Sequence, residues 1–214
     1  MGLPDFHPEV GQLVEEKSFE PGYRGAWFRC KINEVCGKGY RMKIALEYCD
    51  FPEEEPHSAM LYKKPNRSKN AKMELMFRPH YPTIYRENEL PDISTISKAV
   101  VALTDAWKVG DLVDWWCDGC YWSGTLVEAL EDGKFKIHLL PPPAGEGSFY
   151  DASCKDLRPS LDWTPEHGWT LPIPTGMKNC SPCARIIEPM NRVAEMRKLC
   201  LTMGLLAELI ATSL

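Results

Sequence analysis

The chain has 214 residues, of which 44% are hydrophobic, and a formal net charge of -5. This length allows one or two domains with modest cores, and the negative charge argues against a general nucleic-acid binder. The sequence has no apolar run of about 18 residues that could span a membrane, and its first residues lack the pattern of a secretory signal. We therefore expect an intracellular protein that does not cross a membrane and has a basic partner, such as a Lys/Arg-rich peptide.

The first part of the chain is typical of short strands separated by turns. Alternating apolar and polar residues predict three strands, and a fourth ends at Arg78-Pro79. An acidic loop follows the third strand at residues 50–56, and a basic loop covers residues 63–69. The 18 prolines of the chain favour strands and loops over helices. The four expected strands are 11–17, 27–36, 42–48 and 75–78.

A second set of strands follows a proline-containing linker at residues 81–106, in which 97–105 could be a strand or a turn of helix. Asp132-Gly133 is the hairpin turn expected within this set, and Leu157-Arg158-Pro159 ends it as Arg78-Pro79 ends the first. Five short strands in so few residues are typical of a small, strongly bent barrel. The expected strands are 111–116, 121–130, 134–139 and 148–151.

The two sets repeat one pattern about a hundred residues apart, which indicates a duplicated module. Gly11-Gln12-Leu13-Val14-Glu15 leads into a turn and Gly25-Ala26-Trp27-Phe28. Gly110-Asp111-Leu112-Val113-Asp114 leads into Gly119-Cys120-Tyr121-Trp122. Adjacent strand residues face opposite sides of a sheet, so one ring of each aromatic pair can enter a core while the other lines a surface.

The tail differs from both modules, because residues 184–214 are apolar at helical spacing. We expect one amphipathic helix here, bent at Gly204. It could pack against the tandem, or it could pair with a partner protein or with its own copy. We favour the second possibility, because an acidic tandem closed by Trp163 and Trp169 offers little groove for a long helix.

Nine cysteines without a secretory signal are expected to be reduced thiols. The pairs Cys117/Cys120 and Cys180/Cys183 have Cys-x-x-Cys spacing and could in principle supply four zinc ligands. The first pair straddles a tight turn and lies far from the second along the chain, so we favour small, buried thiols. No metal and no cofactor is expected.

At its Gly-Trp-Phe and Asp-Gly-Cys-Tyr-Trp segments, over about residues 10–174, the chain resembles a plant Agenet tandem of the Tudor-like (Royal) superfamily. Glu47-Tyr48-Cys49-Asp50, Val113-Asp114-Trp115-Trp116 and the closing Asp162-Trp163 and Gly168-Trp169 support the resemblance. It implies a mainly β fold of two small five-stranded Tudor-like barrels in tandem, here followed by a C-terminal amphipathic helix. The expected boundaries are 10–80 for module 1, 81–106 for the linker, 107–174 for module 2 and 175–214 for the tail.

The resemblance also implies a nuclear chromatin reader that binds a methylated lysine of a histone H3 tail. Ring faces hold a methylated ammonium by cation–π attraction, and a carboxylate assists. The expected cage in module 1 is Phe19, Phe28, Tyr48 and Asp50. In the alternative, Phe28 and Tyr48 are core residues. Module 2 has an incomplete set, with Pro141 at the place of one wall. Secondary peptide contacts are expected from Trp27, Phe51, Glu54, Trp116 and Trp122.

The alternative to a histone reader is an RNA-binding, DNA-binding or protein-scaffolding Tudor-like module. Flexible basic residues would give salt-sensitive binding of phosphates, although such runs are more often merely solvated. No enzyme is expected, because the five histidines show no ligand spacing and the sequence has no phosphate-binding loop or nucleophile elbow. The possible nucleic-acid contacts are Lys63, Lys64, Arg67 and Lys69.

Overall fold

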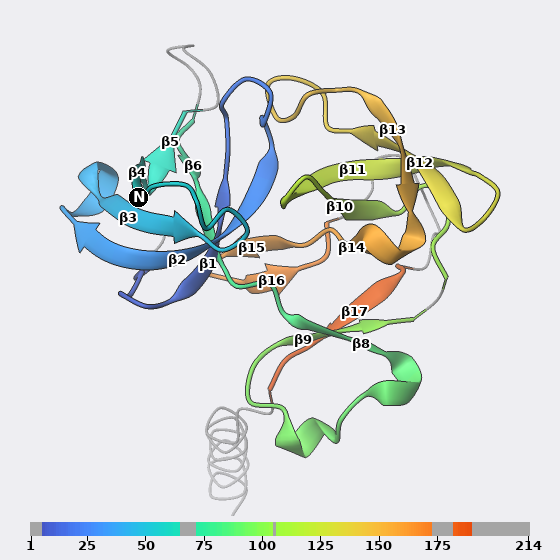
Figure 1. Ribbon diagram of the computed structural model, residues 1–214. Coiled ribbons are helices and arrows are strands. Elements are labelled where there is room, and N and C mark those ends of the chain that lie inside the picture. Colours follow the sequence, from blue (N-terminus) through green and yellow to red (C-terminus); the bar gives the residue numbers. More distant parts are fainter. Residues whose placement is uncertain (1–5, 65–71, 105, 173–181, 190–214) are drawn as a thin grey trace, which may run out of the picture.

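The computed structural model describes residues 6–64, 72–104, 106–172 and 182–189, and within these ranges the chain is almost entirely β-sheet, turn and loop (Figure 1). The only helices in the described ranges are four single 3-10 turns. None of them is long or apolar enough to cross a lipid bilayer. The four turns are η1 (Gly39–Arg41), η2 (Glu87–Glu89), η3 (Ile93–Thr95) and η4 (Cys154–Asp156).

The first five-stranded unit pairs its strands in the order β7-β1-β2-β3-β4. Its apolar residues alternate along the strands, so one face of β2 buries Ala26, Phe28, Cys30 and Ile32 in the core of the unit. A two-stranded ribbon of β5 (Tyr62–Lys63) and β6 (Glu74–Leu75) lies beside it. The strands are β1 (Leu13–Lys17), β2 (Ala26–Cys36), β3 (Lys43–Tyr48), β4 (His57–Met60) and β7 (Phe77–Pro79).

The second unit repeats this pairing as β14-β10-β11-β12-β13. Its long central strand carries a register irregularity between Leu126 and Glu128, and β2 has one between Ile32 and Glu34. The duplicated pattern in the sequence therefore corresponds to a duplicated strand order. The strands are β10 (Leu112–Cys117), β11 (Cys120–Ala129), β12 (Lys134–Leu139), β13 (Phe149–Ser153) and β14 (Leu157–Pro159).

The two units are joined through their central strands, because β2 pairs antiparallel with β11 and makes one ten-stranded sheet. The register sets Trp27 opposite Tyr121, two residues that occupy the same position in the repeat. Antiparallel pairing of equivalent residues relates the two units by an approximate two-fold axis at this point. Positions that correspond in the repeat therefore meet near the axis.

A separate three-stranded sheet, ordered β17-β9-β8, lies below the two units in Figure 1. Strand β9 pairs in parallel with β8 and antiparallel with β17. Part of the expected linker, 81–106, thus forms strands, and the strand at 97–105 is confirmed as β9. These strands are β8 (Thr83–Arg86), β9 (Val100–Leu103) and β17 (Ala184–Ile187).

The expected C-terminal helix does not begin at Ala184, because residues 184–187 form β17. The two faces of the small sheet pack into separate hydrophobic clusters, so successive residues of its strands alternate between the two clusters. Ala184 packs with Val101 in one cluster, and Ile187 packs with Val100 and Ala102 in the other. The rest of the expected helix, from residue 190, lies outside the described residues.

The predicted strands of both units are confirmed with ends displaced by one to two residues. Asp132 and Gly133 have φ values of 57° and 66°, as a tight hairpin turn requires. Beyond β14, a hairpin of β15 (Asp162–Thr164) and β16 (Gly168–Thr170) sets Trp163 opposite Trp169. Trp169 is buried against Tyr81, so this hairpin links the second unit to the start of the three-stranded sheet.

Candidate functional site

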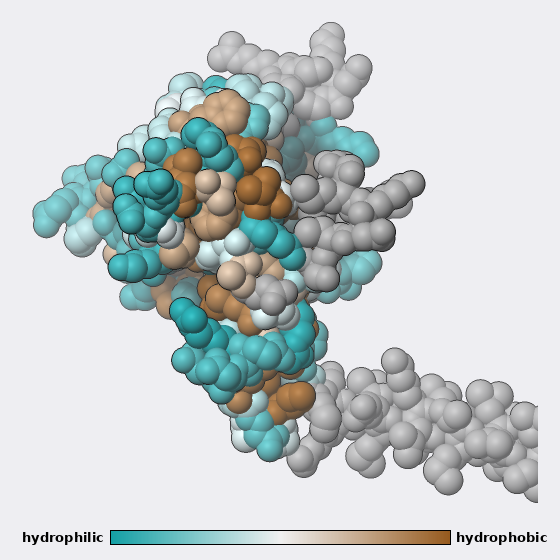
Figure 2. All heavy atoms as spheres, turned by 90° about the vertical axis from the view of Figure 1, so that its right-hand side faces the viewer, coloured by the Kyte–Doolittle hydropathy of each residue, from teal (hydrophilic) through white to brown (hydrophobic). Residues whose placement is uncertain are grey.

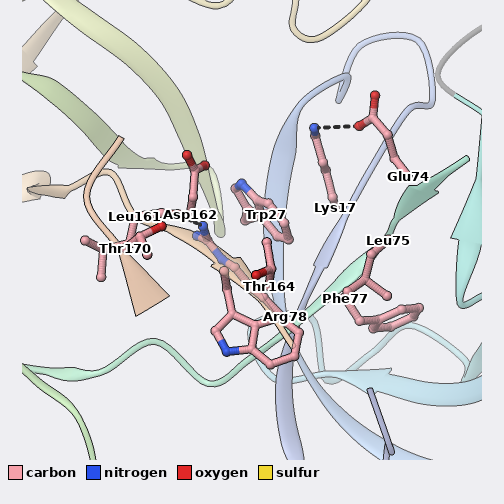
Figure 3. A pocket seen from close by; sticks show the side chains of 11 residues that line it. Lys17, Trp27, Glu74, Leu75, Phe77, Arg78, Leu161, Asp162, Thr164 and Thr170 are labelled. Atoms are coloured by element: carbon pink, nitrogen blue, oxygen red, sulfur yellow. Dashed lines mark hydrogen bonds and ion pairs between the residues drawn. The ribbon is translucent and has the colours of Figure 1, made fainter. Parts of the chain in front are cut away.

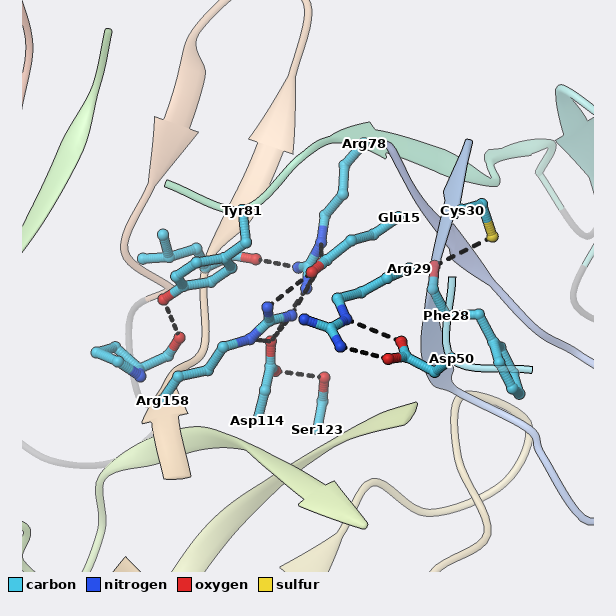
Figure 4. A network of polar contacts seen from close by, with 12 residues as sticks. Glu15, Phe28, Arg29, Cys30, Asp50, Arg78, Tyr81, Asp114, Ser123 and Arg158 are labelled. Atoms are coloured by element: carbon cyan, nitrogen blue, oxygen red, sulfur yellow. Dashed lines mark hydrogen bonds and ion pairs between the residues drawn. The ribbon is translucent and has the colours of Figure 1, made fainter. Parts of the chain in front are cut away.

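Four charged side chains from equivalent positions of the two units meet at the two-fold axis (Figure 4). Arg158 donates to Glu15 at 2.7 and 2.8 Å and to Asp114 at 3.1 and 3.2 Å. Arg78 donates to Glu15 at 2.8 Å and to Asp114 at 3.0 Å. All four residues are buried, with relative exposures of 0 to 5%. The network neutralises itself and fixes how the two units sit relative to one another.

The surroundings of this network supply its remaining hydrogen bonds. Burial on its own would raise the pKa of Asp114, but Arg78 and Arg158 together with the Ser123 hydroxyl hold that pKa below its ordinary value. The Arg78 guanidinium also donates to the Leu161 carbonyl at 2.7 Å. Each guanidinium lies over an aromatic ring, since Arg78 is 3.8 Å from the Trp27 ring centroid and Arg158 is 3.4 Å from that of Tyr121.

Three rings of the first unit form a cluster next to the acidic loop. Phe28, at the start of β2, lies 5.1 Å from Tyr48, at the end of β3, and 6.0 Å from Phe51. Tyr48 and Phe51 are themselves 6.0 Å apart. Phe28 is buried, whereas Tyr48 and Phe51 are half-buried and present part of their surface to solvent. The structure thus brings together Phe28 and Tyr48, two of the three expected cage rings, and places Phe51 beside them.

The expected cage carboxylate, Asp50, is already paired within the protein. It accepts from Arg29 in a bidentate arrangement, with the Nε contact at 2.8 Å. The same guanidinium lies 4.7 Å from the ring centroid of Trp116 in the second unit. Asp50 and Trp116 therefore hold a cation of the protein itself, and the charge of Asp50 is neutralised. Glu54 is an exposed carboxylate of the same loop, and its charge adds to burial, Glu16 and Cys30 in raising the pKa of Tyr48.

Tyr48 is oriented by a polar contact beneath the ring cluster. Its ring stacks on His57 at 4.6 Å, and its hydroxyl lies 3.2 Å from His57 Nε2. The same nitrogen is 3.2 Å from Glu16 Oε2. His57 Nδ1 is buried and has no hydrogen-bond partner among the described residues. These contacts hold the Tyr48 ring in place, so the ring cluster does not need a ligand to form.

Of the other expected aromatic residues, Phe19 lies within the first unit and Trp122 lies at the joint between the units. Phe19 is buried in the core of the first unit, with Lys17 Nζ 5.2 Å from its ring centroid. Trp122 donates its indole NH to the Cys117 carbonyl at 3.2 Å and stacks at 6.1 Å on Tyr23. Tyr23 is an exposed ring that sequence reasoning missed, because it lies in the loop before β2 outside the alternating pattern. It also lies 5.6 Å from Phe28 and extends the ring cluster toward the second unit.

At two turns, one in each unit, a glycine leaves room for a loop of the other unit. A Cβ on Gly119 would lie 2.5 Å from the Phe51 ring, and one on Gly25 would lie 2.2 Å from the Ala144 carbonyl oxygen. Both glycines have positive φ, 77° and 83°. Glu146 strengthens the second contact by accepting from the backbone NH groups of Gly22 and Arg24. Phe51 therefore contacts the second unit although it belongs to the first.

The expected nucleic-acid residues lie only partly within the described ranges. Lys63 is exposed and pairs with Glu20 at 2.6 Å, and Lys64 is also exposed and has a partner. Arg67 and Lys69 lie outside the described residues. Within the described ranges no group of three or more His, Cys, Asp or Glu side chains could hold a metal ion. Cys120 and Cys183 are buried in separate core clusters, and Cys180 lies outside the described residues.

The second unit carries exposed aromatic residues on its edge strand β13. Phe149 and Tyr150 are 58% and 44% exposed. Phe149 stacks on His138 at 4.2 Å, and Tyr150 lies 5.4 Å from Trp115. Figure 2, viewed from the side of this unit, shows small hydrophobic groups separated by hydrophilic side chains. No carboxylate-rich loop equivalent to residues 50–56 accompanies these rings, since the corresponding loop of the second unit is Pro141-Pro142-Pro143.

Residues 11–82, which span the first unit and end just before β8, match the Agenet domain family. The chain thus carries an Agenet domain, a type of binding module, as its resemblance indicated. It is similar to two Arabidopsis thaliana proteins, DUF724 domain-containing protein 6 (30% identical over 159 residues, 74% of this chain) and DUF724 domain-containing protein 3 (28% over 152 residues, 71%). The chain spans 18% of the length of each.

Several solved structures resemble the chain. A crystal structure of Arabidopsis thaliana AGDP1 AGD34 is 22% identical, covers 76% of this chain and 88% of that chain, and has a TM-score of 0.49. A crystal structure of ADCP1 tandem Agenet domain 3-4 is 20% identical, with coverage of 77% and 87% and a TM-score of 0.48.

Proposed function

We propose that this chain is a chromatin reader, in which two Tudor-like barrels bind a histone H3 tail and the ring cluster of the first barrel receives a methylated lysine. The observation that carries the proposal is the group of Phe28, Tyr48 and Phe51, with ring separations of 5.1 to 6.0 Å. Two of its rings are partly open to solvent. Ring faces attract a desolvated methylammonium more strongly than they attract a well-hydrated ammonium.

The charges around the cluster favour a basic peptide. Glu53, Glu54 and Glu55 are all exposed in the loop that carries Phe51. Such a loop attracts the lysines and arginines of a histone tail and repels phosphate. Because Asp50 is neutralised by Arg29, we assign the charge that faces the bound ammonium to Glu54. Asp50 then acts by fixing the start of the loop. This role requires the protein to reach the nucleus.

Calorimetric titration with H3 peptides that differ only in methylation tests the proposal. We expect the methylated peptide to bind more tightly than the unmethylated one. Tyr48→Ala and Phe51→Ala should each remove this preference, because each deletes one wall of the cluster. Phe149→Ala is the control, since it deletes an exposed ring from the second unit, away from the ring cluster. Equal affinity for both peptides in the unaltered protein would refute methyl-lysine binding.

The alternative, an RNA- or DNA-binding or scaffolding module, predicts a different response. Changing Lys63, Lys64, Arg67 and Lys69 together to Ala should then abolish nucleic-acid binding and flatten its salt dependence. Under the reader proposal the same change leaves peptide affinity nearly unaltered, because Lys63 already pairs with Glu20. A steep salt slope without methyl preference would support the alternative. Removing residues 190–214, which keeps β17 in place, and measuring the mass by light scattering would test self-association through the tail.

A further inference from the structure

Glu16 is a buried carboxylate that takes no part in the network at the joint between the units. Glu15, beside it on β1, pairs with two arginines, whereas Glu16 pairs with no lysine or arginine among the residues that the structure describes. The next residue, Lys17, faces the other side of the strand. It pairs with Glu74 at 3.2 Å (Figure 3), so its charge is not available to Glu16.

The partner of Glu16 is His57, which also holds Tyr48. His57 Nε2 lies 3.2 Å from Glu16 Oε2 and 3.2 Å from the Tyr48 hydroxyl. Burial raises the pKa of Tyr48, and the charge of Glu16 and its hydrogen bond with the hydroxyl raise that pKa further. The imidazole stacks on the Tyr48 ring at 4.6 Å. Three polar side chains, from β1, β3 and β4, thus meet directly behind the ring cluster.

The charge of His57 depends on whether Nδ1 carries a proton. In the neutral ring with a proton on Nε2, that nitrogen donates to Glu16 and Nδ1 keeps a lone pair. A proton on Nδ1 would be a buried donor without a partner among the described residues, which opposes protonation, while the nearby carboxylate favours it. About a third of the side chain is exposed, at 33%, so protons can exchange with solvent.

The other titratable groups that act on Tyr48 come from β2 and from the acidic loop. They are Cys30 and the exposed Glu54. Burial raises the pKa of Cys30, with smaller contributions from Glu16 and Cys49, so its thiol stays neutral. Imidazole is the side chain whose charge ordinarily changes between about pH 5 and 8. His57 is therefore the group of this cluster through which pH can act near neutrality.

The His57 ring covers one face of Tyr48, so a methylammonium in the ring cluster approaches Tyr48 from the other side. We infer that Glu16 and His57 regulate the ring cluster: with His57 neutral, the buried charge of Glu16 attracts the bound methylammonium through the Tyr48 ring, and a proton on His57 cancels that charge. The inference rests on the proposed function and concerns the regulation of the same site. Because the bound cation favours neutral His57, binding releases a proton, and affinity falls as the pH is lowered.

The test is calorimetric titration with a histidine-free methylated H3 peptide at about pH 8 and about pH 5.5, on either side of the ordinary imidazole transition. We expect the affinity to fall about tenfold at the lower pH, the order for one charge acting across a ring in a partly buried site. His57→Gln should bind alike at both pH values. His138→Gln is the control, because it removes a half-buried histidine that stacks on Phe149 in the second unit.

A second variant isolates the carboxylate. Glu16→Gln should bind the peptide at about pH 8 as weakly as the unaltered protein does at about pH 5.5, since the buried negative charge is missing in both cases. Glu34→Gln, which removes an exposed carboxylate of the same unit, should leave the affinity unaltered. Circular dichroism checks that each variant is folded.

Proton release distinguishes regulation from a merely structural role. Near the midpoint of the pH profile, titrations in two buffers of different ionisation enthalpy should show protons released on binding by the unaltered protein and none by His57→Gln. Without peptide, the NMR resonances of the His57 and Tyr48 rings should shift with one common midpoint.

The same pH profile in His57→Gln, or tighter binding at the lower pH, would overturn the inference. A methyl preference that is equally strong at both pH values would also overturn it and leave the reader proposal intact. Absence of a methyl preference at either pH would refute the reader proposal and, with it, the regulation.

Discussion

The two units share their strand order and differ in what they present to solvent. Residues that correspond chemically in the repeat, Glu15 with Asp114 and Arg78 with Arg158, are buried together at the axis. Residues that have diverged are those of the loops, where Asp50-Phe51 in the first unit corresponds to Pro141-Pro142 in the second. The two units thus agree in the buried residues that join them and differ in their surface loops. We expect ligand binding at the loops where the units differ, and contact between the units at the residues that they share.

The largest effect should come from breaking the shared joint. Arg158→Met leaves two buried carboxylates with a single arginine, so we expect the free energy of unfolding to fall by about 3–5 kcal/mol. Urea unfolding measures this. Arg185→Met is the control, because Arg185 pairs with Glu87 at the surface, where both side chains are about half exposed, and such pairs contribute about 0–1 kcal/mol. Equal losses in the two variants would show that the network does not hold the units together.

A second comparison separates backbone strain from the contact between the units. Gly11→Ala and Gly119→Ala both place a Cβ on a residue of positive φ, at 84° and 77°, and nothing lies within 4 Å of the Cβ at Gly11. Gly11→Ala should therefore cost only the left-handed strain, about 1–2 kcal/mol. Gly119→Ala must in addition displace the Phe51 ring, which should add about 1 kcal/mol of overpacking.

The binding data from these two variants sharpen the assignment of the site. Displacing Phe51 should lower the affinity for methylated peptide in Gly119→Ala, whereas Gly11→Ala should bind as the unaltered protein does. Calorimetry on both proteins, at a temperature where each is folded, gives the comparison. If both variants bind alike, Phe51 is not a wall of the site.

The sequence predicts the strands and the duplication because both depend on local patterns. The alternation of apolar and polar residues predicts which face of each strand is buried. Asp132-Gly133 predicts its hairpin turn directly. The expectation of a helix from Ala184 was wrong because short apolar runs such as Ala184–Ile187 satisfy a period of two as well as a helical period. A tertiary partner, β9, decided between them. Pairing between residues some 80 positions apart leaves no local signal.

The site was partly predictable for the same reason. The places of Phe28, Tyr48 and Phe51 follow from strand ends, which the alternation gives. The pairing of Asp50 with Arg29 could not be predicted from the sequence, because nothing singles out Arg29 among the residues of β2. The ring on which Arg29 lies, Trp116, also belongs to the other unit. The contact of Tyr23 with Trp122 also depends on how the two units are placed, which the sequence does not show.

The smallest effect on stability is expected from removing the Arg29 guanidinium that lies on the Trp116 ring. Arg29→Ala removes a partly exposed ion pair, in which the side chains of Arg29 and Asp50 are 40% and 16% exposed. We expect a loss of about 1 kcal/mol or less. The indole NH of Trp116 should then respond to added methylguanidinium, which restores the missing group, and the unaltered protein should not respond. An equal response in both proteins would mean that Arg29 does not cover the Trp116 ring in solution.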